Sequence, residues 1–349
     1  MNPSTYFTVT DPDRTYYREN LENRFPLKIL DAHTHMNLPL HVASVPQSRI
    51  DGDWAMQSGC EMSIEDARNF TNALFPGINY RYAAFPFPIK EADTNANNKY
   101  IASLIKMNKV SYGLLTTRPE MHAEDIEREI IDGGFVGLKP YPDYVSAYKG
   151  AEVSIPEFLP KEHCAIAERL NKCIILHLPR AGRFADINNI RELCEIAGKF
   201  PSLKIIIAHL GRCFNPCYFE KAVQLLGEDI HHFWFDTAAV MNPQVLKPAM
   251  EILHDEKILF GLDMPILLFH GSRRWTEATY QNVCREDLAW NRHIEGKDAE
   301  AKYTFFIYEQ INNMLNTMDE LGKSKDYKEG FFFSNADRLF SSCIKTKGD

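Results

Sequence analysis

Short apolar runs recur along the chain, and segments with the residue spacing of amphipathic helices lie between them. Most runs are continuous rather than alternating, which is typical of strands that are covered on both faces. The runs are rich in Ile, Leu, Val and Phe and occupy residues 27–33, 80–86, 110–116, 135–141, 173–179, 204–210, 233–239 and 257–263. This succession of strand–helix units predicts an α/β fold, a single closed (β/α)8 TIM barrel.

Helix start and stop signals support this division. Ser63 and Asp66 have the spacing of a capping box, and other helical segments end in glycine or proline. Two further helices are expected after the eighth strand, close to the C-terminus. The predicted helical segments are 63–75, 124–134, 187–201, 303–322 and 334–340.

Three connections are too long to be simple turns. Residues 36–62, 140–158 and 264–301 follow strands one, four and eight, all at the C-terminal ends of those strands. Long connections in such a barrel usually form the rim and lid over the site. No linker is visible, so we expect an N-terminal arm (1–27) packed on one barrel domain (28–349).

Bulk properties exclude several classes of protein. The 349 residues carry a formal charge of −8, which argues against a nucleic-acid or anionic-membrane surface. No apolar run approaches the roughly 20 residues of a membrane span, and the first 20 residues do not read as a signal peptide. The eight cysteines lack a paired framework, as expected for reduced thiols in a cytoplasmic protein. The oligomeric state stays open, with a homo-oligomer as one outcome.

Two histidines mark the end of the first predicted strand. His33 and His35, in "LKILDAHTHMN", are two residues apart, so a strand would point both rings to the same face. This arrangement suits one metal ion held by two neutral imidazoles. It equally suits two unrelated polar side chains at a strand end, and the motif alone does not decide between them.

Further side chains of the kinds that bind metals favour one of these two interpretations. His177 ends the fifth predicted strand, His209 the sixth and Asp263 the eighth. Because the C-terminal ends of barrel strands converge on one axis, these three should lie near His33 and His35. Five such residues at one end of the barrel favour a metal site.

These motifs together resemble the amidohydrolase superfamily, and most closely its branch of metal-dependent hydrolases, lactonases and amino-muconate-type decarboxylases. The resemblance spans about residues 28–342 and rests on "DAHTH", His177, His209, "FGLDMP" and the tail "SNADRLF". It implies that His33, His35, His177 and Asp263 hold one divalent metal, with zinc expected and manganese as the alternative. By the same resemblance His209 is a catalytic electrophile or acid–base group, and Asp263 is the general base on the activated water.

Lys139, in "GLKPYP" at the end of the fourth strand, leaves one versus two metals open. Some relatives carboxylate a lysine on this strand and use it to bridge two metals. A second ion would then take His177 and His209. The alternative is a cationic group that binds a substrate carboxylate or packs its stem along the barrel.

Arginines near the strand ends suggest an anionic substrate. Arg180 and Arg212 follow His177 and His209 by three residues, and either could bind a carboxylate through its planar fork. Tyr141 is a third candidate for substrate contact. Other candidates for the rim are His41, Trp54, His270, Arg183, Arg273 and Arg274.

The sequence therefore predicts a metal-dependent hydrolase in which activated water attacks a lactone, ester or amide carbonyl of a small carboxylate-bearing substrate. Non-oxidative decarboxylation by the same ligand set is the alternative within the family. A TatD-like nuclease normally has a glutamate where this chain has Lys139, and a histidinol-phosphatase-like barrel closes with an Asp-x-His pair that "GLDMPI" lacks. A non-catalytic metal-binding or carbohydrate-binding barrel would normally lose some of the ligand set.

Overall fold

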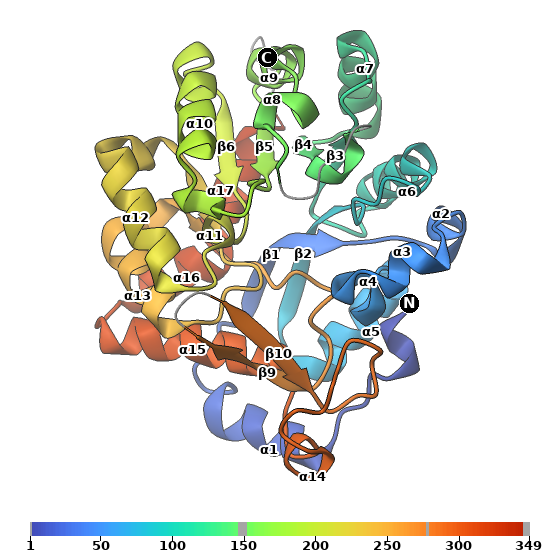
Figure 1. Ribbon diagram of the computed structural model, residues 1–349, viewed down its shortest axis with the longest axis vertical. Helices are drawn as coiled ribbons and strands as arrows, with labels where there is room; N and C mark the ends of the chain where they lie inside the picture. Colours follow the sequence, from blue (N-terminus) through green and yellow to red (C-terminus); the bar gives the residue numbers. More distant parts are fainter. Residues whose placement is uncertain (1, 146–151, 277–278, 345–349) are drawn as a thin grey trace.

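Eight parallel strands pair in sequence order, each with the next, and form the barrel in the middle of the molecule (Figure 1). The computed structural model describes residues 2–145, 152–276 and 279–344. The strands are β1 (Lys28–His35), β2 (Asn79–Phe85), β3 (Tyr112–Thr117), β4 (Gly137–Pro140), β5 (Cys173–Leu176), β6 (Lys204–Ile207), β7 (Trp234–Asp236) and β8 (Ile258–Leu259). A separate antiparallel hairpin consists of β9 (Gly271–Trp275) and β10 (Tyr280–Cys284). The predicted α/β barrel and the positions of its eight strands are confirmed.

Backbone hydrogen bonds complete the barrel between its first and last strands. The Ala32 amide donates to the Phe260 carbonyl at 2.9 Å, the Asp263 amide to His33 at 3.2 Å and the His35 amide to Met264 at 2.8 Å. The chain after β8 thus runs beside β1. The contact places Asp263 against the strand that carries both histidines of the first motif.

Apolar side chains fill both sides of the strands, as the continuous runs predict. Every residue of β3, β4 and β5 is buried. One cluster, which includes Ile29 and Ile174, lies between the barrel and its helices, and a second, which includes Leu30 and Ile175, fills the interior. Neighbouring residues of one strand therefore serve opposite faces.

The helices lie around the barrel (Figure 1). Their bounds are α1 (Asp11–Asn20), α2 (Pro39–Val42), α3 (Gln47–Asp51), α4 (Trp54–Ser58), α5 (Ile64–Leu74), α6 (Thr94–Lys106), α7 (Ala123–Gly133), α8 (Ile155–Phe158), α9 (Lys161–Arg169), α10 (Ile187–Lys199), α11 (His209–Arg212), α12 (Pro216–Leu226), α13 (Pro243–Ile252), α14 (Lys297–Glu300), α15 (Phe306–Glu320), α16 (Lys325–Glu329) and α17 (Asn335–Ser342). Shorter turns are η1 (Pro3–Thr5), η2 (Pro142–Tyr144), η3 (Arg183–Ala185), η4 (Gly227–His232), η5 (Asp255–Lys257) and the π-type η6 (Gly330–Ser334). The five predicted helical segments correspond to α5, α7, α10, α15 and α17.

Local signals set the helix ends where expected. The Ser63 hydroxyl accepts from the Asp66 amide at 3.0 Å, and the Asp66 carboxylate accepts from the Ser63 amide at 2.9 Å, so the predicted capping box is present at α5. Gly134 ends α7 with φ +73°, a conformation that glycine adopts without a Cβ penalty.

The C-terminal tail packs on the interior of the barrel. Phe333, Ala336 and Phe340, from η6 and α17, join the interior apolar cluster. The Phe340 ring lies 5.3 Å from that of Tyr112, at the first residue of β3. Because parallel strands start at one end, the tail covers the end opposite to the predicted site.

The three long connections supply walls of the cavity described below. The first contains α2, α3 and α4, and the third contains the β9–β10 hairpin and α14. The second begins with η2 and ends with α8, and its residues 146–151 lie outside the described part of the chain. Cavity-lining residues from all three agree with the predicted rim.

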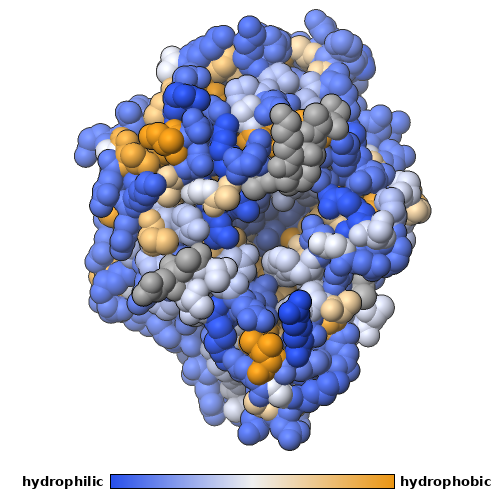
Figure 2. All heavy atoms as spheres, viewed as in Figure 1, coloured by the Kyte–Doolittle hydropathy of each residue, from blue (hydrophilic) through white to orange (hydrophobic). Residues whose placement is uncertain are grey.

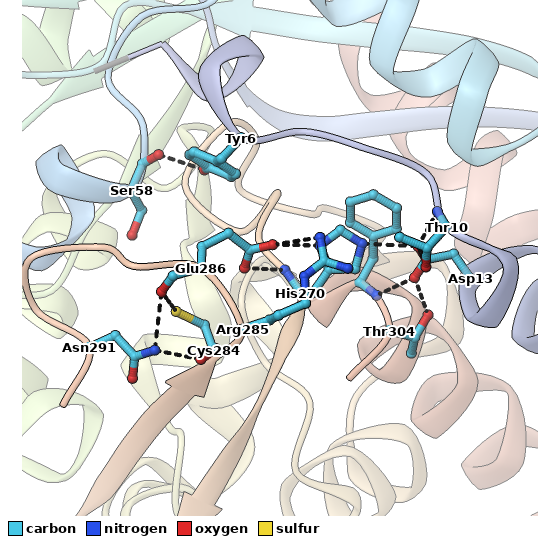
Figure 3. A network of polar contacts seen from close by, with 11 residues as sticks. Tyr6, Thr10, Asp13, Ser58, His270, Cys284, Arg285, Glu286, Asn291 and Thr304 are labelled. Carbon is cyan, nitrogen blue, oxygen red and sulfur yellow. Dashed lines mark hydrogen bonds and ion pairs between the residues drawn. The ribbon is translucent and has the colours of Figure 1, made fainter. Parts of the chain in front are cut away.

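The N-terminal arm is fixed by aromatic and polar contacts. The Phe7 ring lies 4.5 Å from that of Phe70 and 5.0 Å from that of Phe305. In the polar network of Figure 3, the buried Asp13 of α1 lies 2.9 Å from His270 Nε2. The arm therefore contacts both the first long connection, where the Tyr6 hydroxyl donates to the Ser58 carbonyl, and the last. Among the described helices, none is long and apolar enough to span a membrane.

Candidate metal centre and active site

The C-terminal ends of the strands open into a cavity of about 330 Å³. The face seen in Figure 2 is hollowed near its centre, between α4, α11 and β10 as labelled in Figure 1. The five candidate ligands from the sequence all line this cavity: His33, His35, His177, His209 and Asp263. The structure thus brings together side chains from four strand ends spread over more than 200 residues of sequence.

A strand irregularity turns the two histidines of β1 toward the cavity. The pairing of β1 with β2 shifts register between Asp31 and Thr34. Before this shift, Leu30 packs in the interior apolar cluster, whereas after it His33 and His35 line the cavity. A β-bulge commonly redirects side chains beside functional sites. The same-face spacing of the histidines was predicted, but the bulge was not.

His33, His35 and Asp263 form the tightest candidate metal site. Asp263 Oδ1 lies 3.2 Å from His35 Nε2 and 3.5 Å from His33 Nε2. The donor atoms of the three residues all lie within 4.8 Å of one another, and all three side chains are buried. Among the described residues, a second group of this kind joins His33 to His209 and Asp236.

Hydrogen bonds on the far side of each ring fix the tautomers. His33 Nδ1 lies 2.9 Å from Asp236 Oδ2, and His35 Nδ1 lies 3.2 Å from the Pro86 carbonyl oxygen. Because both partners are acceptors, both Nδ1 atoms carry the proton, and the Nε2 lone pairs face Asp263. Two lone pairs and a carboxylate so close together would repel one another, and a cation between them would remove this repulsion. The donor set therefore fits a divalent metal.

Burial keeps these rings in the neutral form that binds metals. Burial lowers the pKa of His33 and of His35 below the usual value and outweighs the nearby carboxylates. For Asp263 burial acts the other way, but the surrounding histidines, His209 foremost, hold its pKa below the usual value, so this carboxyl is ionised. Neutral imidazoles and an ionised carboxylate are the forms in which these side chains bind a divalent metal.

Two buried aspartates organise the site, and the sequence reasoning missed both. Asp236, the last residue of β7, holds the His33 ring and accepts from the backbone amide of His209 at 2.8 Å. Asp31 accepts from the amides of His33, at 2.9 Å, and Leu262, at 3.2 Å. Asp236 could have been found, because "FWFD" ends an apolar run with an acid at the same strand end as the candidate ligands.

His209 occupies an unusual backbone position after β6. The four residues of α11 all have positive φ, +57° at His209 and +63° at Arg212, so this segment is not a regular helix. Gly211 belongs to the run, and a Cβ there would lie 2.5 Å from Phe184 Cβ. Such conformations cost energy and cluster at functional sites.

The ring of His209 presents a lone pair to the cavity. Its Nδ1 donates to the Ala238 carbonyl at 2.9 Å, which leaves Nε2 as an acceptor. Burial lowers the pKa of His209 to about 4, so the ring is neutral at pH 7. The resting form is therefore a proton acceptor.

His177 also lines the cavity, but it stands apart from the tight ligand group. Its ring lies 5.3 Å from that of His209 and 4.8 Å from that of Tyr141. Its buried Nδ1 has no hydrogen-bond partner among the described residues. Burial holds the pKa of His177 well below the usual value. A neutral, unsatisfied imidazole is chemically able to join a metal site.

Lys139 lies fully buried in β4 beneath the cavity. Its ammonium group has no hydrogen-bond partner in the described chain and lies 5.0 Å from the centre of the Phe85 ring. Burial lowers the pKa of Lys139 to about 8. The amine is thus easier to deprotonate than an exposed lysine, which is a requirement for carboxylation.

The two predicted substrate arginines have different surroundings. Arg212 lines the cavity, as does Tyr141, and its Nη1 donates to the Leu178 carbonyl at 3.0 Å. Arg180 does not line it: its guanidinium makes two bonds to Glu192, at 2.6 and 2.9 Å. Both bonds come from the Glu192 carboxylate of α10, so the structure shows Arg180 paired within the protein, and its contact with a substrate stays a prediction.

The other rim candidates from the sequence also fall into two groups, those that line the cavity and those that do not. Trp54 and Arg273 line the cavity, whereas His41, His270, Arg183 and Arg274 do not. Arg49 and Asp143 complete part of the rim as an ion pair at 2.5 Å.

A parallel barrel with imidazoles and carboxylates at its C-terminal strand ends defines a class of metal-dependent enzymes. The chain belongs to the amidohydrolase family, because a family model with the description Amidohydrolase matches residues 31–341. This match confirms the resemblance drawn from the sequence. The family and the solved structures below are enzymes. No curated protein sequence matches the chain.

Several solved structures share the fold. The 5-carboxyvanillate decarboxylase from Sphingomonas paucimobilis is 14% identical, covers 90% of this chain and 99% of its own, and gives a TM-score of 0.54. The 4-oxalomesaconate hydratase from Rhodopseudomonas palustris is 14% identical, with 90% and 96% covered and a TM-score of 0.53. A probable 2-pyrone-4,6-dicarboxylic acid hydrolase from Acinetobacter baumannii is also 14% identical, with 90% and 99% covered and a TM-score of 0.52. These likenesses establish the fold, and the three names describe three different reactions.

Proposed function

We propose that this protein is a metal-dependent hydrolase that cleaves a lactone, ester or amide bond in a small carboxylate-bearing substrate. The observation that carries the proposal is the convergence of two imidazole lone pairs and the Asp263 carboxylate within 3.5 Å. Three acceptors so close together repel one another in the absence of a cation, which supports a metal ion between them.

The proposed ligands are His33, His35, His177 and Asp263, and zinc is the expected ion, with manganese as the alternative. When bound, such an ion polarises a carbonyl group and lowers the pKa of water. Asp263, ionised and beside both β1 imidazoles, accepts a proton from the attacking water. The proton that Asp263 takes from water passes by way of His209 Nε2 to the leaving oxygen or nitrogen as its bond to the carbonyl carbon breaks. Arg212, and Tyr141 beside His177, orient the substrate carboxylate.

Non-oxidative decarboxylation is the second candidate. The same residues would then hold a substrate carboxylate at the metal site. His209, neutral at rest, would take a proton from solvent at Nε2 and deliver it to the carbon that loses carbon dioxide. Two of the solved structures with this fold are named as decarboxylases, of 5-carboxyvanillate and of 2,6-dihydroxybenzoate. The fold alone does not choose between these reactions.

One assay separates the candidates. The purified, metal-analysed protein is incubated with lactones, N-acyl amino acids and aromatic carboxylates, while acid release and carbon dioxide release are followed in parallel. Hydrolysis gives acid without carbon dioxide, and decarboxylation gives the reverse. The matched control is His33→Ala, which should lose both bound metal and turnover. Turnover that persists in a metal-free His33→Ala protein would disprove the metal-dependent mechanism.

A further inference from the structure

Arg273 is a cavity residue that the proposed mechanism does not use. It lies in the middle of β9, in the lid hairpin, and its side chain lines the same cavity as His209 and Asp263. Only 1% of the residue is exposed. Burial lowers the pKa of Arg273 to about 10, so the guanidinium is still charged at neutral pH.

The contacts of this guanidinium hold it without neutralising it. Nη1 donates to the Ala239 carbonyl at 2.7 Å, and Nε donates to Asn282 Oδ1 at 2.8 Å. The rings of Tyr280 and Phe214 lie 4.3 and 4.9 Å from its central carbon. Among the described residues, no carboxylate forms an ion pair with Arg273. A buried, unpaired cation is costly unless an anion joins it.

Two other arginines near the cavity, unlike Arg273, are each paired with a carboxylate. Arg274, the next residue of β9, is bonded to Glu295 at 2.7 Å and does not line the cavity. Arg49, on the opposite rim, is paired with Asp143 and Glu91. Arg273 therefore carries its charge into the cavity without the carboxylate that these two arginines have.

The hairpin that presents Arg273 is fixed at both ends. His270 precedes β9 and Glu286 follows β10, and the two side chains meet at 2.7 Å (Figure 3). The same imidazole bonds to Asp13 on its other side. A guanidinium on such a base is preorganised, so an anion that binds it loses less entropy in ordering the site.

We propose that Arg273 is a specificity-determining residue that binds an anionic group of the substrate, a carboxylate, on the β7 side of the cavity. The inference rests on the proposed function for the existence of a substrate in this cavity. The Ala239 carbonyl that holds Arg273 follows the Ala238 carbonyl that holds His209. The anion would thus be held by the same loop that orients the acid–base histidine. Arg212, tied to the Leu178 carbonyl after β5, contacts a different wall.

Binding of a small anion tests this without turnover. Benzoate and the neutral benzamide are titrated into the purified protein by calorimetry, before and after removal of metal with a chelator. The wild type should prefer benzoate in both states. Arg273→Met should weaken benzoate binding at least about tenfold, as for loss of a charge-assisted hydrogen bond, and leave benzamide unchanged. Arg273→Lys should lose part of the preference, because lysine lacks the fork.

The adjacent arginine provides the matched control. Arg274→Met removes the same charge from the same strand but outside the cavity, and should leave both affinities unchanged. A wild type without preference for benzoate, or equal losses in the two Met variants, overturns the proposal. If Arg273→Met does not fold, a crystal structure of the wild type with benzoate decides: its carboxylate must contact the Arg273 guanidinium, and a carboxylate bound elsewhere contradicts the assignment.

The outcomes separate this inference from the proposed function. His33→Ala should lose metal yet keep the preference for benzoate, since Arg273 is not a metal ligand. Preserved anion binding in a protein that never turns over a substrate would leave Arg273 assigned and the hydrolase proposal refuted. Loss of preference only in Arg273 variants that still hold metal supports the assignment of Arg273, whereas turnover tests the hydrolase proposal.

Discussion

Asp236 Oδ2 lies 2.9 Å from His33 Nδ1, and both side chains are almost fully buried. The two residues come from β7 and β1, so the contact crosses the barrel end. Burial raises the pKa of Asp236, but the histidines around it, His33 first, outweigh this and lower it to about 2. An ionised carboxylate thus orients the ring whose other nitrogen faces Asp263. Contacts of this kind make a metal-binding imidazole more basic and fix its tautomer.

Asp236→Asn should therefore weaken metal binding although it removes no ligand. We expect the affinity for zinc to fall about 10–100-fold, as for other losses of a carboxylate behind a metal-bound histidine. Competition with a chromophoric chelator measures it. The matched control is Asp143→Asn, which changes a cavity carboxylate that pairs with Arg49 instead. Equal affinities in both variants and the wild type would contradict the role of Asp236.

His209→Asn tests whether this residue is catalytic or a ligand. With one metal, the variant should keep its metal content and lose about 10²-fold in kcat, as expected for a lost acid–base group. Elemental analysis and steady-state kinetics on the same preparation give both values. Loss of metal from this variant would instead favour the two-metal alternative, in which Lys139 is carboxylated. Anomalous scattering would then show two ions beside Lys139.

Arg180 and Arg212 should have opposite effects. Arg180→Met leaves Glu192 without its buried partner, so the free energy of unfolding should fall by about 3–5 kcal/mol with little change in kcat/KM. Arg212→Met should lower kcat/KM by an amount equivalent to about 2–5 kcal/mol, as for one partner of a buried charge pair, with a smaller change in stability. Denaturant unfolding and kinetics on both variants test this. A fall in kcat/KM for Arg180→Met alone would reverse the assignment.

His270 should make stability depend on pH. Burial lowers its pKa, but hydrogen bonds and ion pairs with Asp13 and Glu286 outweigh burial and raise the pKa above the usual value. The stabilisation is therefore complete below the unfolded pKa of about 6.5 and is lost as the pH rises through the folded pKa. His270→Gln should lower the melting temperature most at pH 6, and the gap to the wild type should narrow toward pH 9.

The control for this series is His232→Gln, since His232 is exposed. Its melting temperature should follow the wild type at every pH. Asp13 has the opposite pH dependence. Burial raises its pKa, but hydrogen bonds to His270 and Thr10 outweigh burial and lower the pKa to about 2. The contribution of Asp13 to stability is therefore lost only in acid. A gap that widens with pH in His270→Gln would show that the imidazole is neutral in the folded protein.

The sequence predicted best those features that depend on hydrophobic periodicity and on the positions of strand ends. Continuous apolar runs predict buried parallel strands, and the ends of parallel strands must meet, so the placement of His33, His209 and Asp263 follows from topology. Side-chain pairing does not follow from it. Arg180 and Arg212 have the same spacing from a histidine, but only a contact between distant elements shows that Glu192 takes one of them.

The features that the sequence did not reveal share a physical cause, because each depends on contacts between distant segments. Asp236 supports a ligand from a strand far away in the sequence, and a lone acid after an apolar run has many other uses. Arg273 and Arg274 were both candidates for the rim, but two adjacent arginines in a sequence do not reveal which one lines a cavity. The bulge in β1 is likewise a matter of pairing with β2, which is set by tertiary packing.

The contact of Asp13 with His270 joins residues 257 positions apart in the chain. During synthesis the N-terminal arm is made before its partner imidazole, which follows 257 residues later. Contacts between such distant segments form slowly, because a long loop must close first. The lid that carries Arg273 can therefore be locked in place only at a late stage of folding, so the binding cavity is completed after the barrel that supports it.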